Sequence, residues 1–343
     1  MSSSSENASS RSSSTSYGPP DGHFGPAVSG DRVGDYTLDE RVGKGQYGVV
    51  WTVHESADKV LKILRADREM REDVEEERRI LERLQSSPHV VSLLDAFEHP
   101  TDAEPHPVFV FARATQDLFH LLHETDRVER SMMQRLVRQL LGAVDFLREN
   151  NVIHLDIKPE NILIFGDGLR LCDFGTARIL PSDAPEYGQT TEYRALEMIL
   201  QDPVGVGADV WSAGCVVYEI VTAAEGTRTR TLFESRAAMV EFEEENDDVV
   251  DRTHLFLLIE LFGPIPRHIT RRSKHYFTAR GEIRGLDYEI DPTTSLCELM
   301  RDDGLAREAA EAWSEFLQPF FRFSPRKRIQ NLTELFTHEL LTN

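Results

Sequence analysis

The stretch that decides the fold is HLDIKPEN, residues His154–Asn161. It places a carboxylic acid at Asp156, an ammonium group at Lys158 and an amide at Asn161, and Pro159 stiffens the loop between the last two. Asp156 can accept a proton from an attacking hydroxyl group, Lys158 can lie against a migrating phosphate, and Asn161 can bind a magnesium ion. Phosphoryl transfer needs such groups because its catalysis consists mostly of positioning and charge neutralisation. The alternative is a loop that contains these residue types by chance.

A second acidic group follows at Asp173, which opens the tripeptide D-F-G twelve residues after Asn161. Between them, the apolar runs Ile162–Phe165 and Leu169–Cys172 flank Gly166-Asp167-Gly168, a pattern that predicts two strands joined by a tight turn. This hairpin would bring Asp173 back beside Asn161, where the two side chains could share a metal ion. Magnesium favours few protein oxygens plus substrate phosphates, which suits one carboxylate and one amide.

A glycine-rich stretch, GKGQYGVVW, lies upstream at Gly43–Trp51. Gly43, Gly45 and Gly48 follow a G-x-G-x-x-G spacing, and glycines allow a backbone to approach phosphates closely. A dinucleotide-binding loop with this spacing opens a helix, whereas the β-branched and aromatic run Val49–Val53 predicts a strand. The pattern therefore indicates strand, glycine turn, strand, with an ordinary hairpin as the alternative.

Two charged side chains follow at Lys62 and Glu77. Lys62 lies in the alternating run Lys59–Leu64, which predicts a strand, and the other lysine of this run is interpreted as a solvated strand start. The charged stretch Asp67–Leu84 carries apolar residues at helical spacing from Ile80 onward, which predicts an amphipathic helix. Glu77 lies three residues before Ile80 in this helix.

In this order the motifs resemble those of protein kinases, including the glycine loop, the catalytic loop H-R-D-L-x-x-x-N and D-F-G. The resemblance implies catalysis by Asp156, Lys158, Lys62 and Glu77, and magnesium binding by Asn161 and Asp173. It implies ATP binding by Val42, Gly43, Gly45, Gly48, Val50, Lys62, Phe111, Ala112 and Ala114, of which the last three match the adenine pocket and hinge.

Three further matches extend the resemblance along the chain. Thr190–Glu197 resembles the end of the activation segment. Asp209 resembles the aspartate that braces the catalytic loop. Arg328 resembles the arginine that pairs with the glutamate closing the activation segment.

The resemblance implies an α+β, bilobal protein-kinase fold. Residues 35–114 would form a strand-rich small lobe and residues 115–343 a mainly helical large lobe, with ATP and Mg²⁺ in the cleft between them. Residues 1–34 are rich in serine, glycine and proline, so they bury too little surface to offset the entropy of ordering. We expect these residues to form a disordered tail.

The composition fits a globular protein. The chain has 343 residues, 40% of them hydrophobic, which is enough for a sizeable core. It contains no apolar run near the ~18 residues that span a membrane, and no secretory signal pattern follows Met1. Cys172, Cys215 and Cys297 lie far apart, which argues against disulfides or zinc and suits a reducing compartment. We expect an intracellular monomer, cytoplasmic or nuclear, that binds no membrane.

Several details resemble the CMGC group of serine/threonine kinases and, within it, the SR-protein kinases. Lys158, two residues after Asp156, resembles the residue that serine/threonine kinases have at that position. Tyr193-Arg194, directly before Ala195, resembles the corresponding pair in the CMGC group. Leu196, where most of the group has proline, resembles SR-protein kinases, as does the stretch His254–Arg267. The resemblance implies transfer of the ATP γ-phosphate to serine in basic, Arg/Ser-rich proteins.

The chain departs from the pattern of SR-protein kinases at three places. Phe174 replaces a leucine, Gly48 stands where serine is frequent, and His123–Met133 runs into the next helix without the family's long spacer. Two alternatives stay open. One is a CMGC kinase of CDC-like or proline-directed specificity, and the other is a pseudokinase scaffold, against which the intact set of Lys62, Asp156, Asn161 and Asp173 argues.

The net charge of −21, from 38 basic and 59 acidic residues, disfavours direct nucleic-acid binding and favours basic partners. The densest acidic run, Glu241–Asp248, is either a docking surface for an arginine-rich peptide or a solvated loop. The candidate docking residues are Glu260, Asp251 and Arg194, and Glu260 lies in the stretch that resembles the docking groove of the family. Arginine pairs bidentately with carboxylates, so Arg-Ser repeats should bind better than Lys-Ser repeats.

Leu155 stands where many kinases carry an arginine that binds a phosphorylated activation loop. Without that arginine, a phosphate on Thr190 or Thr191 would have one fewer cation to order it. We therefore predict activity without phosphorylation of the loop.

Overall fold

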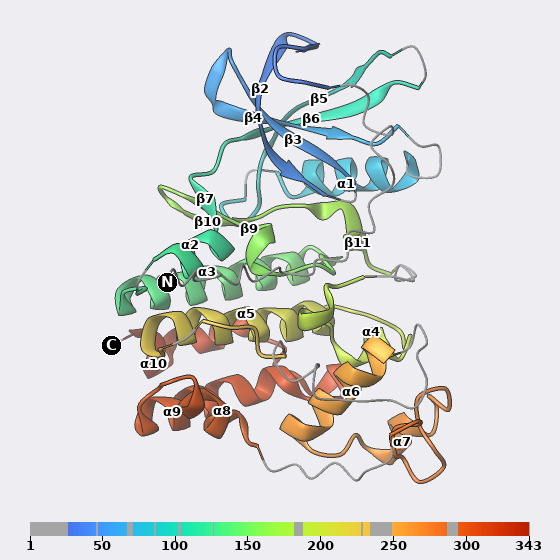
Figure 1. The fold of residues 1–343 in the computed structure, drawn as a ribbon, viewed down its shortest axis with the longest axis vertical. Coiled ribbons are helices and arrows are strands. Elements are labelled where there is room, and N and C mark those ends of the chain that lie inside the picture. Colours follow the sequence, from blue (N-terminus) through green and yellow to red (C-terminus); the bar gives the residue numbers. More distant parts are fainter. Residues whose placement is uncertain are drawn as a thin grey trace, which may run out of the picture.

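The computed structural model describes residues 27–45, 47–66, 71–85, 87–101, 104–125, 127–181, 188–227, 229–233, 249–286 and 294–342. Figure 1 shows two lobes, with a twisted sheet and one flanking helix above a mainly helical lobe. The predicted α+β, bilobal fold is thereby confirmed. The predicted acidic run Glu241–Asp248 lies outside the described residues.

The small lobe is built on a six-stranded antiparallel sheet with the order β1-β2-β3-β4-β6-β5. Its strands are β1 Arg32–Val33, β2 Tyr36–Lys44, β3 Gly48–Val53, β4 Ser56–Leu64, β5 Leu93–His99 and β6 His106–Ala112. Valine, isoleucine and aromatic side chains are frequent in β3, β4 and β6, and they suit a buried pleated surface. One cluster of these side chains, which includes Leu38, Trp51, Leu61 and Val110, belongs to the small lobe alone.

The folded part of the chain extends upstream of the predicted boundary at residue 34. Arg32 and Val33 pair with Thr37 and Tyr36, and Val33 is buried. The prediction of a disordered tail is therefore wrong for these two residues, because their short strand finds both a pairing partner and an apolar contact. Residues 1–26 lie outside the described part of the chain.

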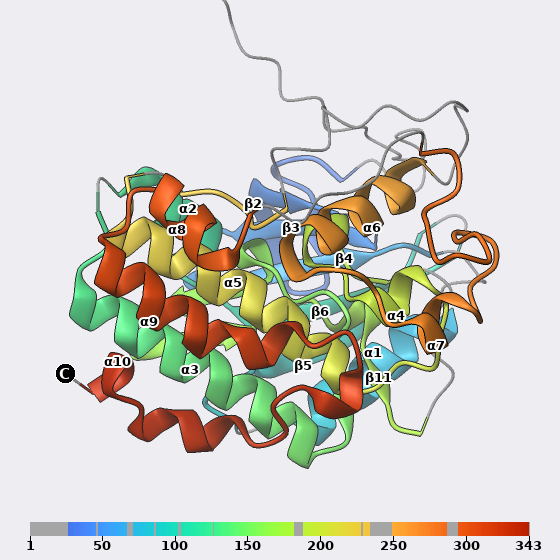
Figure 2. The same ribbon diagram turned by 90° about the horizontal axis from the view of Figure 1, so that it is seen from below.

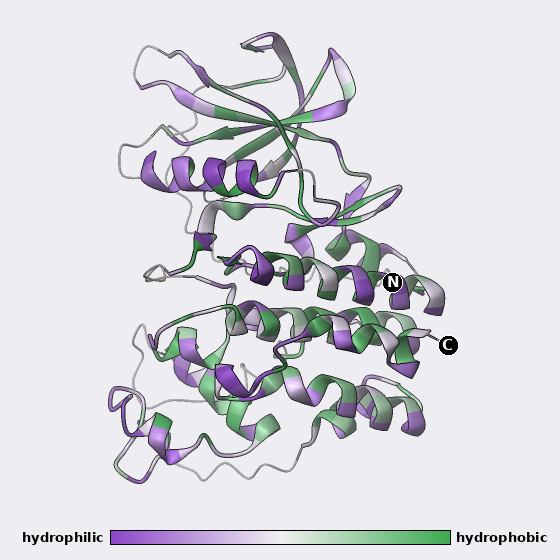
Figure 3. Cartoon of the chain, turned by 180° about the vertical axis from the view of Figure 1, so that it is seen from behind, coloured by the Kyte–Doolittle hydropathy of each residue, from purple (hydrophilic) through white to green (hydrophobic). Residues whose placement is uncertain are grey.

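Helix α1, Arg71–Arg83, flanks the sheet and confirms the amphipathic helix predicted from the charged stretch. Ile80 and Leu81 are buried, whereas the outer face is polar and is purple in Figure 3. Glu72 and Asp73 lie in the first turn of α1, where their negative charges interact favourably with the helix dipole.

The large lobe is organised around one buried helix. Its helices are α2 Leu118–Glu124, α3 Arg130–Glu149, α4 Leu196–Ile199, α5 Gly207–Glu225, α6 Val249–Phe262, α7 Arg267–Thr270, α8 Leu296–Asp302, α9 Arg307–Leu317 and α10 Glu339–Thr342. Almost every residue of α5 is buried, and α3 and α9 run beside it in Figures 1 and 2. A helix that is apolar around its whole circumference belongs in the interior, and α5 accordingly forms the centre of this lobe. None of the helices in the described ranges combines the length and apolar character that a membrane crossing requires.

Short strands connect the two lobes and frame the catalytic loop. They are β7 Gln116–Asp117, β8 Val152–Ile153, β9 Ile162–Phe165, β10 Gly168–Leu171 and β11 Arg178–Ile179. β9 and β10 pair antiparallel, which confirms the predicted hairpin, and β8 pairs with β11. The loop His154–Asn161 therefore begins at one of these small sheets and ends at another.

The two lobes share one apolar core. Ile80 and Leu81 of α1 and Phe111 of β6 belong to the same buried cluster as Leu121 of α2 and Leu140 of α3. The inner side of the small lobe is therefore packed against side chains of the large lobe.

Candidate active site

The catalytic loop is anchored to the central helix α5. The backbone N–H groups of His154 and Leu155 donate to the two carboxylate oxygens of Asp209, at 2.7 and 2.9 Å. Leu155 is fully buried and has a positive φ of 62°, which is uncommon for a bulky side chain. Asp209 thus holds the loop in a conformation that an isolated peptide would rarely adopt.

Asp156 lies at the centre of a group of polar side chains. Its Oδ1 atom accepts a hydrogen bond of 2.8 Å from the hydroxyl of Thr190, and its Oδ2 atom accepts one of 2.8 Å from Asn161 Nδ2. Lys158 Nζ lies 3.0 Å from Asp156 Oδ2 and donates to Thr190 Oγ1 at 2.8 Å. The structure therefore brings the three predicted residues of the loop together and adds Thr190, which the sequence had assigned only to the activation segment.

Gln189 is a structural residue that the sequence did not reveal. Its buried side chain donates to the carbonyl of Ala208 and to Ser212 Oγ on α5, and accepts from the backbone N–H of Ala195. Its own N–H donates to the carbonyl of Leu155 at 2.7 Å. Gln189 therefore fixes the end of the activation segment against both α5 and the catalytic loop.

Lys62 joins the small lobe to the D-F-G stretch. Its Nζ atom lies 2.6 Å from Glu77 Oε1 and 2.8 Å from Asp173 Oδ1. Glu77 is only 2% exposed, and Asp173 has a left-handed φ of 60°, which an aspartate tolerates better than most residues. Lys62 is therefore held between a carboxylate of α1 and a carboxylate at the end of the β9–β10 hairpin.

The charges of this cluster depend on one another. Burial would lower the pKa of the Lys62 ammonium, but Asp173 and Glu77 outweigh it and hold that pKa above its usual value, so the cation persists at neutral pH. Burial would raise the pKa of Asp173, but the Lys62 charge outweighs it and holds that pKa below its usual value. Burial raises the pKa of Glu77, and the Lys62 charge opposes this effect.

Replacing Glu77 with glutamine is expected to reduce turnover by about 10²-fold, because a displacement of about 1 Å in a positioning group can cost that much. The variant keeps the shape of the side chain but removes the charge that holds Lys62. Steady-state kinetics with ATP varied checks this expectation, and circular dichroism checks that the fold is retained. Glu76→Gln changes a neighbouring, more exposed carboxylate of α1 and serves as the control. Near-normal turnover of Glu77→Gln would refute the assigned role.

A cleft of about 640 Å³ opens between the lobes, and all the residues predicted to bind nucleotide line it. These are Val42, Gly43, Gly45, Gly48, Val50, Lys62, Phe111, Ala112 and Ala114. Asp156, Lys158, Asn161, Asp173 and Glu77 reach the same cleft. Its volume falls in the range of small-molecule sites. Lys59 lies elsewhere, with its ammonium 5.6 Å from the centre of the Tyr36 ring. The prediction that it is a solvated strand start is wrong, because β4 begins at Ser56 and Lys59 is half-buried within it.

Gly48 occupies a position that has no room for a side chain. A Cβ atom on this residue would clash with the main-chain carbonyl oxygen of Ile63 on β4. Gly48 is opposite Leu64 in the register of β3 and β4, so the close approach belongs to the pairing of these strands. A side chain at this position would therefore require the pairing of β3 with β4 to shift.

A buried ion pair closes the activation segment, as predicted. Arg328 donates through both terminal nitrogens to the two oxygens of Glu197, each at 2.6 Å, and also to the carbonyl of Gly207 at 2.7 Å. The two side chains are 0% and 3% exposed. A bidentate pair in this setting is strong because both charges are shielded from water.

The candidate docking residues lie on and near α6. Asp251 and Arg194 bind each other, with 2.9 Å between Arg194 Nη1 and Asp251 Oδ1, and the hydroxyl of Tyr276 donates to the other oxygen of Asp251. These two residues therefore hold α6 against the activation segment, and their docking role stays a prediction. Glu260 lies further along the helix and lines a separate pit.

A family model described as protein kinase domain matches residues 36–341. This chain belongs to the protein kinase family. The kinase is 34% identical over 253 residues to cyclin-dependent kinase-like 4 of Mus musculus, an alignment that covers 69% of this chain and 66% of the relative. It is 25% identical over 369 residues to the serine/threonine-protein kinase SRPK of Physarum polycephalum, covering 86% and 83%. It is 31% identical over 210 residues to serine/threonine-protein kinase 36 of Mus musculus, covering 58% of this chain but 16% of the relative.

The family and these relatives show an ATP-dependent serine/threonine protein kinase of the CMGC type. Kinases of this family use ATP with Mg²⁺. The donor set fits a magnesium ion. Asn161 donates to Asp156 through Nδ2, so its side-chain oxygen can face a metal ion. Asp173 accepts from Lys62 through one carboxylate oxygen, so the other oxygen can do the same. Hard oxygen donors of this kind, without thiolate or imidazole, are those that magnesium prefers.

Proposed function

We propose that this kinase phosphorylates serine in basic, Arg/Ser-rich proteins, as the SR-protein kinases do. The observation that carries the proposal is the position of Glu260, a carboxylate among the apolar walls of a pit on the large lobe. The net charge of −21 supports it, because an acidic protein attracts basic substrates and repels acidic ones.

The proposed reaction is an in-line transfer of the γ-phosphate. The serine hydroxyl would approach Asp156, which accepts its proton as the new bond from oxygen to phosphorus forms and the bond between the γ-phosphorus and the bridging oxygen of ADP breaks. Lys158, 3.0 Å from Asp156, would neutralise the migrating group. Lys62 would align the α- and β-phosphates, and Glu77 holds it in place. Asn161 and Asp173 would hold Mg²⁺, which supplies further charge neutralisation.

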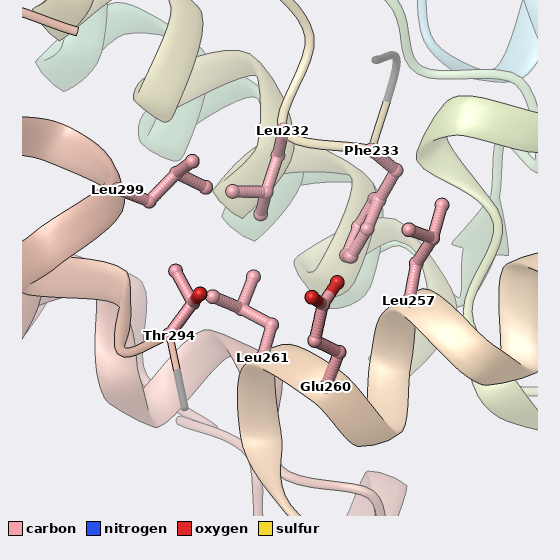
Figure 4. A pocket seen from close by; sticks show the side chains of 7 residues that line it. All are labelled: Leu232, Phe233, Leu257, Glu260, Leu261, Thr294 and Leu299. Carbon is pink, nitrogen blue, oxygen red and sulfur yellow. The ribbon is translucent and has the colours of Figure 1, made fainter. Parts of the chain in front are cut away.

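The pit around Glu260 is small, about 20 Å³, so an arginine would place its guanidinium at the mouth of the pit and would not fill it. Its walls are Leu232, Phe233, Leu257, Leu261, Thr294 and Leu299, from α6, α8 and the segments beside them. Figure 4 shows the carboxylate of Glu260 pointing into the space between Phe233 and the leucine side chains. The guanidinium of an arginine at this mouth would be attracted by the carboxylate of Glu260, and its fork of N–H groups matches the geometry of a carboxylate.

A peptide panel tests the proposed specificity. We expect Arg-Ser repeats to have a lower KM than Lys-Ser repeats, because lysine cannot form the bidentate pair. Glu260→Gln should raise the KM for Arg-Ser repeats about fivefold, as expected for the loss of a solvent-exposed ion pair worth about 1 kcal/mol. Raising the ionic strength above ~0.15 M should raise the KM of the same peptides, since charges are then screened within about 8 Å.

The matched control is Asp302→Asn, which removes an exposed carboxylate of α8 outside the pit. Its KM values should equal those of the unaltered kinase. Equal KM values for Arg-Ser and Lys-Ser repeats, or a KM that ignores both Glu260→Gln and salt, would contradict the proposed docking role.

One observation favours a second specificity, directed to serine followed by proline. The carbonyl oxygen of Gln189 accepts hydrogen bonds from Arg194 Nε and Nη2, at 3.2 and 3.1 Å. Gln189 directly precedes Thr190, which contacts Asp156, so this carbonyl lies beside the path of the substrate. Because this carbonyl already accepts two hydrogen bonds, the substrate residue beside it does not have to donate an N–H group. Proline has no N–H group and would fit at that position. Ser-Pro and Ser-Ala peptides of otherwise equal sequence distinguish the two specificities.

A further inference from the structure

Arg178 and Asp73 form an ion pair that connects the activation segment to the small lobe. Arg178 Nη2 lies 2.7 Å from Asp73 Oδ1, although the two residues are 105 positions apart in the chain. Their side chains are 18% and 37% exposed, so the pair is partly shielded from water. A second terminal nitrogen of Arg178 donates to the carbonyl of Ala177 at 2.8 Å, which restricts the guanidinium further.

Each partner lies close to an element that carries part of the active site. Asp73 precedes Glu77 by four residues in α1, so the two carboxylates lie one turn apart on the same face of the helix. Arg178 is opposite Ile153 in the pairing of β11 with β8, and Ile153 directly precedes the catalytic loop. The pair therefore spans the distance between the helix that presents Glu77 and the sheet that starts the catalytic loop.

Neutral contacts and the Arg178–Asp73 pair hold the described part of the activation segment near the catalytic loop. Leu155 is buried and apolar, so the catalytic loop offers no cation at that position. Arg178 is already satisfied by Asp73, and Gln189 holds the end of the activation segment through neutral hydrogen bonds. Both contacts are made by side chains of the chain itself.

We propose that the Arg178–Asp73 pair, termed here the interlobe latch, sets the position of Glu77 and thereby of Lys62. Arg178 and Asp73 are positioning residues, because they act through Glu77 and touch no reacting atom. The latch lets the kinase turn over without phosphate on its activation segment. This inference rests on the proposed mechanism, and it concerns ATP alignment rather than the choice of protein substrate.

A charge swap tests the latch. The unaltered kinase, Asp73→Arg, Arg178→Glu and the double variant are treated with phosphatase, and their peptide-independent ATP hydrolysis is measured. We expect each single variant to lower kcat/KM for ATP about tenfold, and the double variant to recover to within about threefold, since the opposite charges meet again. Arg78→Glu, which reverses a charge in an exposed pair of the same helix, should leave ATP hydrolysis unchanged.

Two further measurements separate positioning from stability. The melting temperatures of the single variants should stay close to that of the unaltered kinase although their kcat/KM for ATP falls. Glu77→Gln should lower kcat/KM by a smaller factor in the Arg178→Glu background than alone, because both changes disturb the same helix position. Single variants with normal ATP hydrolysis, a double variant no better than its parents, or fully additive effects would overturn the latch. If the swap restores hydrolysis but Arg-Ser peptides show no preference, the latch stands and the substrate proposal fails.

Discussion

Asp156→Asn is expected to lower kcat by roughly 10²–10⁴-fold, the range by which general-base catalysis accelerates proton transfer. Asparagine keeps the size of the side chain and can still bond Thr190 and Asn161, but it cannot accept the proton of an attacking hydroxyl. ATP binding should change little, because Lys62 and the glycine loop would contact the nucleotide independently of Asp156. Single-turnover kinetics and a fluorescence titration with an ATP analogue measure the two quantities separately.

The control for this variant is Asp167→Asn, which removes an exposed carboxylate in the turn between β9 and β10. It should retain full activity. Retained turnover in Asp156→Asn would exclude Asp156 as the base. Loss of nucleotide binding together with turnover would instead indicate that the loop had changed its conformation.

Arg328→Met should lower the free energy of unfolding by about 3–5 kcal/mol, the cost of leaving one member of a buried ion pair without its partner. Methionine fills much of the same space, so the main loss is the charge that neutralises Glu197, which is 3% exposed. Denaturation by urea, followed by tryptophan fluorescence, measures the change.

Two further variants serve as controls for Arg328→Met. Arg326→Met removes an exposed arginine two residues away and should alter stability by less than about 0.5 kcal/mol. The double variant Glu197→Gln with Arg328→Met should be more stable than Arg328→Met alone, because no charge is then left buried. A double variant less stable than Arg328→Met would show that packing, and not charge, dominates at this position.

The sequence predicted those parts of the site that are encoded by short-range patterns. The catalytic loop, the hairpin and the glycine loop each lie within a dozen residues, and each was found where its spacing placed it. The choice of Lys62 over Lys59 also follows from local geometry, because residues three apart in a strand point to opposite faces. Only one of the two faces belongs to the cleft.

The sequence could not predict contacts that depend on distant parts of the chain. Gln189 has no local signature, and its role arises because α5 passes beside the activation segment. The partner of Arg178 is likewise chosen by the docking of α1 and not by any spacing. Asp251 and Arg194 were both predicted as docking residues, but their pairing with each other across 57 positions has no local signature.

The apolar core shared by the two lobes bears on how this kinase can be divided. Leu81 and Phe111 belong to the same buried cluster as side chains of α2 and α3, so cutting the chain at the hinge would expose apolar surface on each fragment. The small lobe is therefore not an interchangeable module. A chimaera with another kinase would have to exchange the apolar surfaces of both lobes together.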